Sequence, residues 1–303
     1  MENILKTSNL TKTFSKKTAV SNVNMNIKKG DIYGFIGRNG AVKTTLIKML
    51  VGLSSPTSGS IELFDDKNLN KQRRKIGTVI EAPAFVPHLS AKENMYIQWK
   101  LLGSKDKSII DETLKLVGLE DVGKKKVKKF SLGMKQRLGI AMTLMGEPEF
   151  LVLDEPTNGL DPEGIIEVRK MLKKLNQERG LTILVSSHIL GELAKLATRY
   201  GIINDGVLVE EFTDKELSER CRAGLIVKVD DVHKASEILK GELNTENFNV
   251  LNENTLEIFD FAENPGVITK AFAKNDISVD SISQKSVDLE EYFMSVIGGN
   301  RDA

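Results

Sequence analysis

Short runs of apolar residues alternate along this chain with segments of helical apolar spacing. The runs lie within 32–37, 150–155 and 181–187, and short apolar runs of this kind are typical of strands buried on both faces of a sheet. The segment 162–178 has helical spacing. Strand, helix and strand in this order predict a parallel sheet covered by helices. An Asp-Gly pair at 205–206 predicts a hairpin near the end of this pattern.

A glycine-containing turn follows the strand predicted at 32–37. The next helix is predicted to begin at Thr44 or Thr45. Leu46 and Leu50 are about one helical turn apart, so one face of this helix should pack on the sheet. Strand, turn and helix in this order are the layout of a phosphate-binding site.

Two other parts of the chain have different patterns. The section from about 90 to 129 is polar with helical apolar spacing, and Ser90 followed by Glu93 is a capping box that predicts a helix start. Beyond about Thr213, short alternating segments follow in the order β-α-β-β-α-β. This order predicts a small α+β domain.

The composition narrows the class of protein. The 303 residues suffice for one large domain and one small one, and 40% hydrophobic with 28% charged residues is ordinary for a folded protein. Lys+Arg (43) and Asp+Glu (42) nearly cancel, so nucleic acid is not a predicted partner. Cys221 is the only cysteine, which excludes an internal disulfide and suits the cytoplasm. No apolar run reaches the ~18 residues of a membrane span, so any membrane role must come from a partner.

The segment GRNGAVKTT carries the strongest chemical signal. Gly37 and Gly40 allow backbone N–H groups to surround a phosphate, and Lys43 can reach the phosphate oxygens. Thr44 can bind Mg²⁺. Val42 stands where this ATP-binding pattern has glycine, and a β-branched side chain there adds bulk beside the phosphate and disfavours unusual backbone angles. We therefore expect the affinity for ATP to be reduced or lost. The predicted ATP-binding residues of this segment are Gly37, Arg38, Asn39, Gly40, Ala41, Val42, Lys43, Thr44 and Thr45.

Two adjacent carboxylates end the apolar strand at 150–155. Asp154 is predicted to hold Mg²⁺ together with Thr44, and Glu155 is predicted to activate the attacking water as the catalytic base. A carboxylate at a strand end can also be a helix cap. The phosphate-binding pattern upstream favours the catalytic interpretation.

The segment FSLGMKQRL places Ser131 at a helix start and Gly133 just inside the helix, where free N–H groups form an anion site. A simple N-cap is the alternative. This segment resembles the signature motif of ATP-binding cassette (ABC) ATPases, with Leu132 where the family usually has glycine. The resemblance implies a head-to-tail homodimer, in which Ser131 and Gly133 of one subunit bind the ATP held by the other.

The resemblance covers about residues 3–220 and implies further roles. His188 resembles the switch histidine that contacts the γ-phosphate, and Phe14 resembles the aromatic residue that stacks on adenine. A lone aromatic residue is also consistent with the core. Residues 158–161 resemble the D-loop at the dimer interface. Glu81 stands where most members have the glutamine that links Mg²⁺ to the membrane subunit, and its carboxylate could bind the metal.

Glu81 and the C-terminal segment LEEYFMSVIGG resemble the subgroup that exports, or confers immunity to, lantibiotics and bacitracin. The implied fold is α/β: a P-loop NTPase cassette at 1–215 with a mostly parallel core sheet, an antiparallel β subdomain and a helical subdomain at about 85–145. A small α+β domain follows at 220–303. The implied protein is a cytoplasmic MgATP-hydrolysing homodimer, held on the inner face of the cell membrane by separate permease subunits, that exports an antimicrobial peptide or antibiotic.

Two alternatives remain open. One is a non-transport cassette ATPase that acts on DNA or ribosomes, although such proteins generally carry two cassettes or a long coiled coil, and neither is found in this sequence. The other is a regulatory or hydrolysis-impaired subunit, which only Val42 supports. The presence of Glu155 and His188 favours an active enzyme.

Overall fold

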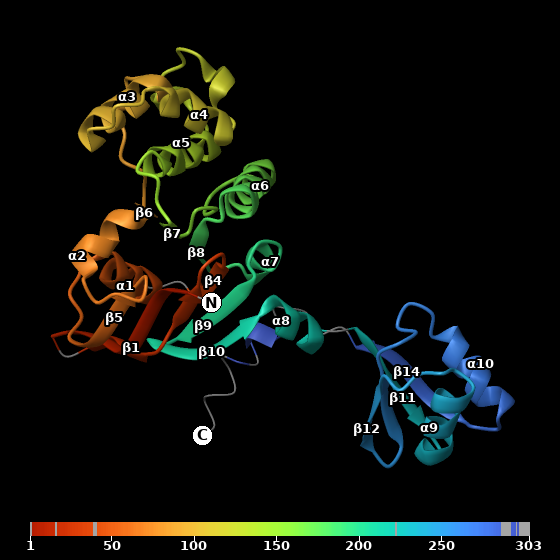
Figure 1. Cartoon of the computed structure of the whole chain (residues 1–303). Coiled ribbons are helices and arrows are strands. Elements are labelled where there is room, and N and C mark those ends of the chain that lie inside the picture. The colour runs from red at the N-terminus through yellow and green to blue at the C-terminus, as the bar shows by residue number, and fades with distance from the viewer. Residues whose placement is uncertain are drawn as a thin grey trace. The chain divides into compact units, whose positions relative to one another are not determined.

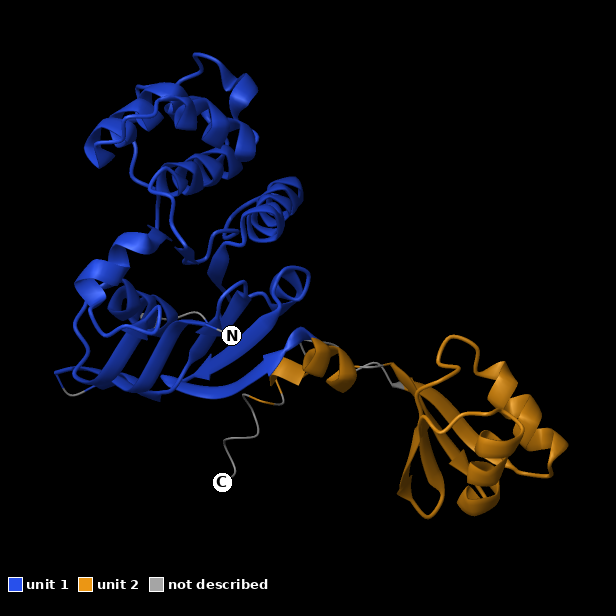
Figure 2. Cartoon of the chain, viewed as in Figure 1, with its two compact units in different colours: residues 1–214 blue, residues 215–303 orange. Residues whose placement is uncertain are grey.

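The computed structural model describes residues 2–15, 17–38, 41–221, 223–285, 292–294 and 296. The chain divides into two compact units, Met1–Asp214 and Lys215–Ala303 (Figure 2). Each unit has a hydrophobic core of its own.

The first unit begins with an antiparallel sheet in the order β2-β1-β3, with β5 paired to β1. Its buried residues, such as Leu5 and Leu10, join Leu46 and Leu50 in one core. The face of the first long helix that was predicted to be apolar is therefore buried. The strands are β1 (Asn3–Phe14), β2 (Lys17–Val23), β3 (Asn26–Lys28) and β5 (Ser58–Leu63).

A second sheet has six strands in the order β10-β9-β4-β8-β7-β6. The strands from β9 to β6 pair in parallel, and β9 and β10 form the predicted antiparallel hairpin. β4, β7 and β8 are buried along their whole length, as their continuous apolar runs predict. The strands are β4 (Ile32–Gly37), β6 (Ile76–Val79), β7 (Phe150–Leu153), β8 (Thr182–Ser187), β9 (Arg199–Asn204) and β10 (Val207–Thr213).

The helix after β4 begins earlier than predicted. α1 spans Ala41–Val51, whereas the sequence placed its start at Thr44 or Thr45. The apolar stripe of α1 begins at Val42, which packs against the core one helical turn before Leu46, and the sequence pattern assigned this residue to the glycine-containing turn. The phosphate-binding segment therefore includes the first turn of α1.

Three helices form a separate region at one end of the first unit (Figure 1): α3 (Ala91–Leu102), α4 (Ser108–Leu116) and α5 (Leu132–Leu144). The predicted capping box is present, because Ser90 Oγ accepts from the Glu93 N–H while the Glu93 carboxylate accepts from the Ser90 N–H at 2.6 Å. α6 (Pro162–Arg179) packs against α5 and β8.

The other helices among the described residues up to Arg220 are short. None of the described helices has the length and apolar character to cross a bilayer. The short helices are α2 (Leu69–Gln72), α7 (Leu190–Leu193) and α8 (Asp214–Arg220), with 3₁₀ helices η1 (Arg73–Lys75), η2 (Glu120–Val122) and η3 (Val127–Lys129).

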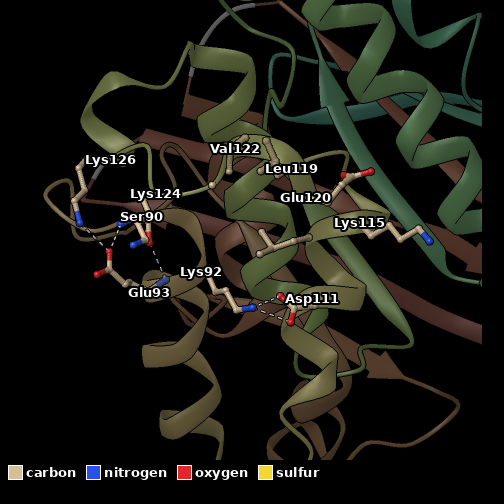
Figure 3. Close-up of a pocket in the computed structure, with 12 residues that line it drawn as sticks. Ser90, Lys92, Glu93, Asp111, Lys115, Leu119, Glu120, Val122, Lys124 and Lys126 are labelled. Carbon is tan, nitrogen blue, oxygen red and sulfur yellow. Dashed lines mark hydrogen bonds and ion pairs between the residues drawn. The ribbon is translucent and has the colours of Figure 1, made fainter.

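A cavity of about 780 Å³ lies among α3, α4 and the segment that follows α4 (Figure 3). Two ion pairs border it: Lys92 with Asp111 at 2.6 Å, and Lys126 with Glu93 at 3.1 Å. None of the predicted ATP-binding residues lines it. Its apolar lining residues are Leu114, Leu119 and Val122.

The second unit contains the predicted β-α-β-β-α-β order. Its four strands lie in the order β12-β13-β11-β14, and every pair is antiparallel. Most of the closing helix predicted at 289–297 lies outside the described residues. The predicted fold class, a P-loop cassette followed by a small α+β domain, is confirmed. The elements are β11 (Gly224–Val229), α9 (Val232–Gly241), β12 (Phe248–Asn252), β13 (Thr255–Ile258), α10 (Gly266–Lys274) and β14 (Val279–Lys285).

The end of β4 lies so close to β9 that only glycine fits at position 37. A Cβ built on Gly37 would lie 2.6 Å from Ile203 Cγ2 and 2.9 Å from the Ile203 carbonyl oxygen. We expect Gly37→Ala to lower the free energy of unfolding by about 1–3 kcal/mol, the usual effect of overpacking, in a thermal or denaturant titration. The control is Gly191→Ala, because a Cβ there meets no atom within 4 Å. Equal stability of the two variants would contradict this account.

Candidate functional site

The parallel strands β4, β7 and β8 end at the same edge of the sheet, and this edge gathers the predicted chemistry. α1 follows β4 there, the two adjacent carboxylates follow β7, and the histidine follows β8. Ligand sites of open parallel sheets lie at this edge. The predicted residues that meet there are Lys43, Thr44, Asp154, Glu155 and His188.

Lys43 has a buried ammonium group surrounded by oxygen atoms. Its Nζ lies 2.7 Å from the Gly37 carbonyl oxygen, 3.3 Å from that of Arg38 and 3.0 Å from Glu155 Oε1. Only 2% of the residue is exposed. Lys43 also belongs to the first turn of α1, where backbone N–H groups lack partners within the helix. Ammonium and helix N-terminus together form a site that favours phosphate.

Thr44 and Asp154 fit the predicted magnesium site. The Thr44 hydroxyl donates to Asp154 Oδ2 at 2.7 Å, so two oxygen ligands of the kind that Mg²⁺ prefers lie side by side. Among the described residues, no cluster of three or more His, Cys, Asp or Glu side chains could hold a metal. A magnesium ion here would take most of its ligands from phosphate and water, which is usual for this metal.

Glu155 adopts a left-handed backbone conformation, with φ at +50°. Successive residues of an extended strand point to opposite faces. The turn at Glu155 lets both adjacent carboxylates approach α1: Asp154 contacts Thr44, and Glu155 contacts Lys43.

His188 completes this arrangement. Its Nδ1 lies 2.6 Å from Glu155 Oε2. An ionised carboxylate can only accept, so Nδ1 carries the proton of this hydrogen bond. The Glu155 carboxylate therefore lies between an ammonium group and an imidazole, which orients it for proton transfer.

The structure corrects the expectation about the backbone at Val42. Because α1 begins at Ala41, Val42 is a helical residue without a positive φ, and its half-buried side chain packs against the core. The predicted conflict with unusual backbone angles is therefore wrong. The effect of its bulk on a phosphate remains a prediction. Asn39 and Gly40 lie outside the described residues, as does the side chain of Ala41.

The other residues predicted around the nucleotide have separate surroundings. Phe14 ends β1 and is 51% exposed, so the alternative of a core residue is wrong, and adenine stacking remains a prediction. The Lys12 ammonium lies 5.0 Å from the centre of its ring. Arg38 is exposed and offers its carbonyl oxygen to Lys43, whereas Thr45 is buried in α1.

Ser131 and Gly133 lie in the helical region rather than beside Lys43. Ser131 caps α5 by accepting a hydrogen bond from the Met134 N–H at 3.2 Å, and Leu132 next to it is 50% exposed. Within the described residues, neither Ser131 nor Gly133 forms a hydrogen bond with the cluster around Lys43. The capping interpretation of Ser131 is confirmed, and its predicted contact with ATP requires a second copy of the chain.

Glu81 also lies apart from the predicted metal ligands. It is exposed, has a φ of +63° and forms an ion pair with Lys48 Nζ at 2.7 Å. The hydrogen bond and the positive charge of Lys48 hold the pKa of Glu81 below its ordinary value. A role of Glu81 in metal binding remains a prediction.

Some contacts of the site were not foreseen in the sequence. Ser186 on β8 donates to Asp154 Oδ1 at 2.6 Å, and Thr157 donates to Glu192 Oε2 at 2.7 Å across the segments that follow β7 and β8. The available signal for Ser186 was its place in the pair of serines that follows the apolar residues of β8, since a buried hydroxyl needs a partner.

Comparison with known proteins identifies close relatives. The family model described as ABC transporter matches residues 20–158. The bacitracin transport ATP-binding protein BcrA of Bacillus licheniformis is 45% identical over 302 residues, which cover 99% of each chain. The lantibiotic transport ATP-binding protein SrtF of Streptococcus pyogenes is 48% identical over 69% of this chain and 90% of its own. The solved dimeric structure of MJ0796, a bacterial ABC transporter cassette, has a TM-score of 0.61 and 30% identity over 69% of this chain and 98% of its own.

The ion pair of Lys48 with Glu81 predicts that the pKa of Glu81 changes when Lys48 is replaced. We expect Lys48→Met to raise the pKa of Glu81 towards its ordinary value, because the variant removes both the hydrogen bond and the positive charge that favour the carboxylate. Carboxyl ¹³C NMR across acidic pH, with Glu81→Gln to assign the signal, measures this shift. Lys67→Met is the control, since Lys67 pairs with Glu62 instead. An unchanged Glu81 titration in Lys48→Met would show that the pair does not form in solution.

Proposed function

Since this chain belongs to the ABC transporter ATP-binding proteins, ATPases whose hydrolysis is coupled to transport, we propose that it drives the export of a peptide antibiotic of the bacitracin or lantibiotic class. The observation that carries the ATPase chemistry is the meeting of Lys43 and Thr44 with Asp154 and Glu155 at one sheet edge. The similarity to bacitracin and lantibiotic transport proteins supports the class of cargo.

Each residue of the cluster has a distinct part in the proposed hydrolysis. Lys43 and the N–H groups of α1 bind the phosphates, and Thr44 with Asp154 holds Mg²⁺, which supplies charge neutralisation at the phosphate oxygens. Glu155 accepts a proton from the attacking water. His188 orients the Glu155 carboxylate through Nδ1.

The active form in this proposal is a homodimer. Ser131 lies at the exposed start of α5 and, within the described residues, forms no hydrogen bond with the Lys43 cluster of its own chain. The N-terminus of α5 is an anion site of the same kind as that of α1. A head-to-tail pair of chains would place it on the γ-phosphate held by the partner, and a similar cassette has been solved as a dimer. The export path itself belongs to separate permease subunits.

Removing the proposed general base tests the hydrolysis. We expect Glu155→Gln to lower ATP turnover by at least about 100-fold, because the amide cannot accept the proton, while MgATP binding persists. Turnover is measured as phosphate release, and dimer formation is measured by sedimentation with MgATP. Glu149→Gln is the matched control, because Glu149 forms an exposed ion pair with Lys75 before β7.

The same variant tests the cargo in cells. A host that carries Glu155→Gln in place of the unchanged chain should become more susceptible to bacitracin or to a lantibiotic. Turnover that survives Glu155→Gln would refute the catalytic assignment. Unchanged susceptibility to both antibiotics, with turnover abolished, would refute the proposed cargo alone.

Replacing Val42 by glycine should have opposite effects on the stability of the fold and on the affinity for ATP. We expect Val42→Gly to tighten MgATP binding by about tenfold, or about 1.4 kcal/mol, because it removes the Cβ bulk beside the phosphate. We also expect it to lower the free energy of unfolding by about 1 kcal/mol or more, because glycine disfavours the helix and core packing is lost.

The matched control is Val51→Gly at the other end of α1, where the valine also packs against the core. It should show the loss of stability without the gain in affinity. Titration calorimetry with MgATP measures the affinity, and scanning calorimetry of the protein alone measures the stability. If Val42→Gly binds ATP no more tightly than the unchanged chain, the side chain of Val42 does not limit the site.

A further inference from the structure

Ser186 is a buried hydroxyl to which the roles above give no part. It is the second-last residue of β8, and none of its surface is exposed. β8 pairs in parallel with β7, with Val185 beside Leu153. Ser186 is therefore level with Asp154, the first residue after β7.

The hydroxyl of Ser186 joins two neighbouring residues of the site. Its Oγ donates to Asp154 Oδ1 at 2.6 Å and accepts from the Glu155 N–H at 2.9 Å. A hydroxyl has one hydrogen, an ionised carboxylate can only accept and an amide N–H can only donate, so the direction of both bonds is fixed. The distance to Asp154 is typical of a charge-assisted hydrogen bond.

The first of these bonds acts on the predicted metal ligand. Oδ1 of Asp154 is held by Ser186, while Oδ2 accepts from Thr44 at 2.7 Å. With a partner on each oxygen, the carboxylate cannot rotate without losing a hydrogen bond. Oδ2 is thereby kept beside the Thr44 hydroxyl, the other proposed magnesium ligand.

The second bond acts on the backbone of the proposed general base. Glu155 has a φ of +50°, in a region that side chains other than glycine rarely adopt. Its N–H is held by Ser186, and its carbonyl oxygen accepts from the Asn158 N–H at 3.1 Å. These bonds restrain the left-handed turn that directs the Glu155 carboxylate towards Lys43 and His188.

We propose that Ser186 is a positioning residue for ATP hydrolysis, an inference that rests on the function proposed above. It acts through its neighbours: it orients Asp154 for Mg²⁺ and holds Glu155 in the turn that presents the general base to water. A single side chain thus sets the geometry of metal binding and of proton transfer together.

The test removes the hydroxyl with the least change of shape. We expect Ser186→Ala to raise the Mg²⁺ concentration needed for half-maximal ATP binding and to lower kcat, each by about 10- to 100-fold, as is usual when a hydrogen bond that orients a metal ligand is lost. Mg²⁺ is titrated at a fixed concentration of a fluorescent ATP analogue, a measurement that requires no turnover. Phosphate release at saturating Mg²⁺ then gives kcat.

Thr182→Val is the matched control on the same strand. Thr182 is as fully buried as Ser186, and its hydroxyl accepts from the Gly30 N–H at 2.9 Å at the opposite end of β8. Thr182→Val also removes one buried hydroxyl but touches neither carboxylate. Thermal unfolding of both variants separates loss of stability from loss of geometry. A merely structural role of Ser186 predicts similar losses of stability and an unchanged Mg²⁺ dependence in both, and that result overturns the proposal.

Measurements on the unchanged chain distinguish a failure of this inference from a failure of the proposed function. If it shows no Mg²⁺-dependent ATP binding, the proposed function fails, and the role of Ser186 fails with it. If it binds and hydrolyses MgATP while Ser186→Ala keeps the same Mg²⁺ dependence and kcat, only the role of Ser186 is overturned.

Discussion

Two carboxylates that directly follow β7 contact the same helix, although successive residues of an extended chain point to opposite sides. The left-handed conformation of Glu155 removes this conflict, at a typical cost of about 1–2 kcal/mol for a residue other than glycine. Asp154 then contacts Thr44, and Glu155 contacts Lys43 on the same turn of α1. The strained turn is sustained by its surroundings, because β7 is buried along its length between β6 and β8.

The buried ammonium group of Lys43 is the second constraint on the fold, because it must be surrounded by oxygen atoms. A charge removed from water must find partners, and Lys43 finds them in the Gly37 carbonyl oxygen and the Glu155 carboxylate. Both partners have little freedom to move: Gly37 is packed against Ile203, and Glu155 is hydrogen-bonded to His188. Sheet packing and site electrostatics are thus connected through the same few residues, which keeps the phosphate-binding groups in fixed positions.

Much of this arrangement could be predicted from the sequence, because its physical signals are local. The continuous apolar runs identified β4, β7 and β8, and the Ser90 capping box identified the start of α3. The start of α1 was predicted too late because Val42, the first core-facing residue of the helix, was assigned to the glycine-containing turn, and the same error led to a wrong expectation for its backbone.

The contacts of Ser186 and of Glu81 could not be predicted, because they depend on strand register and on the path of a loop. Ser186 meets Asp154 only when β8 pairs with β7 in the observed register. Glu81 meets Lys48 where the loop after β6 passes through a positive φ at Glu81. No spacing in the sequence encodes either contact. The motifs identified which residues carry the chemistry, and the fold determined which of them touch.

The cavity between α3 and α4 has a pharmacological consequence. Inhibitors aimed at the phosphate loop must compete with abundant cellular ATP and must discriminate among many ATPases that share its chemistry. A compound that filled the cavity would contact the apolar side chains of Leu114 and Leu119 and the ion pair of Lys92 with Asp111. Because none of the predicted nucleotide ligands lines this cavity, such a compound would not compete with ATP for the same residues.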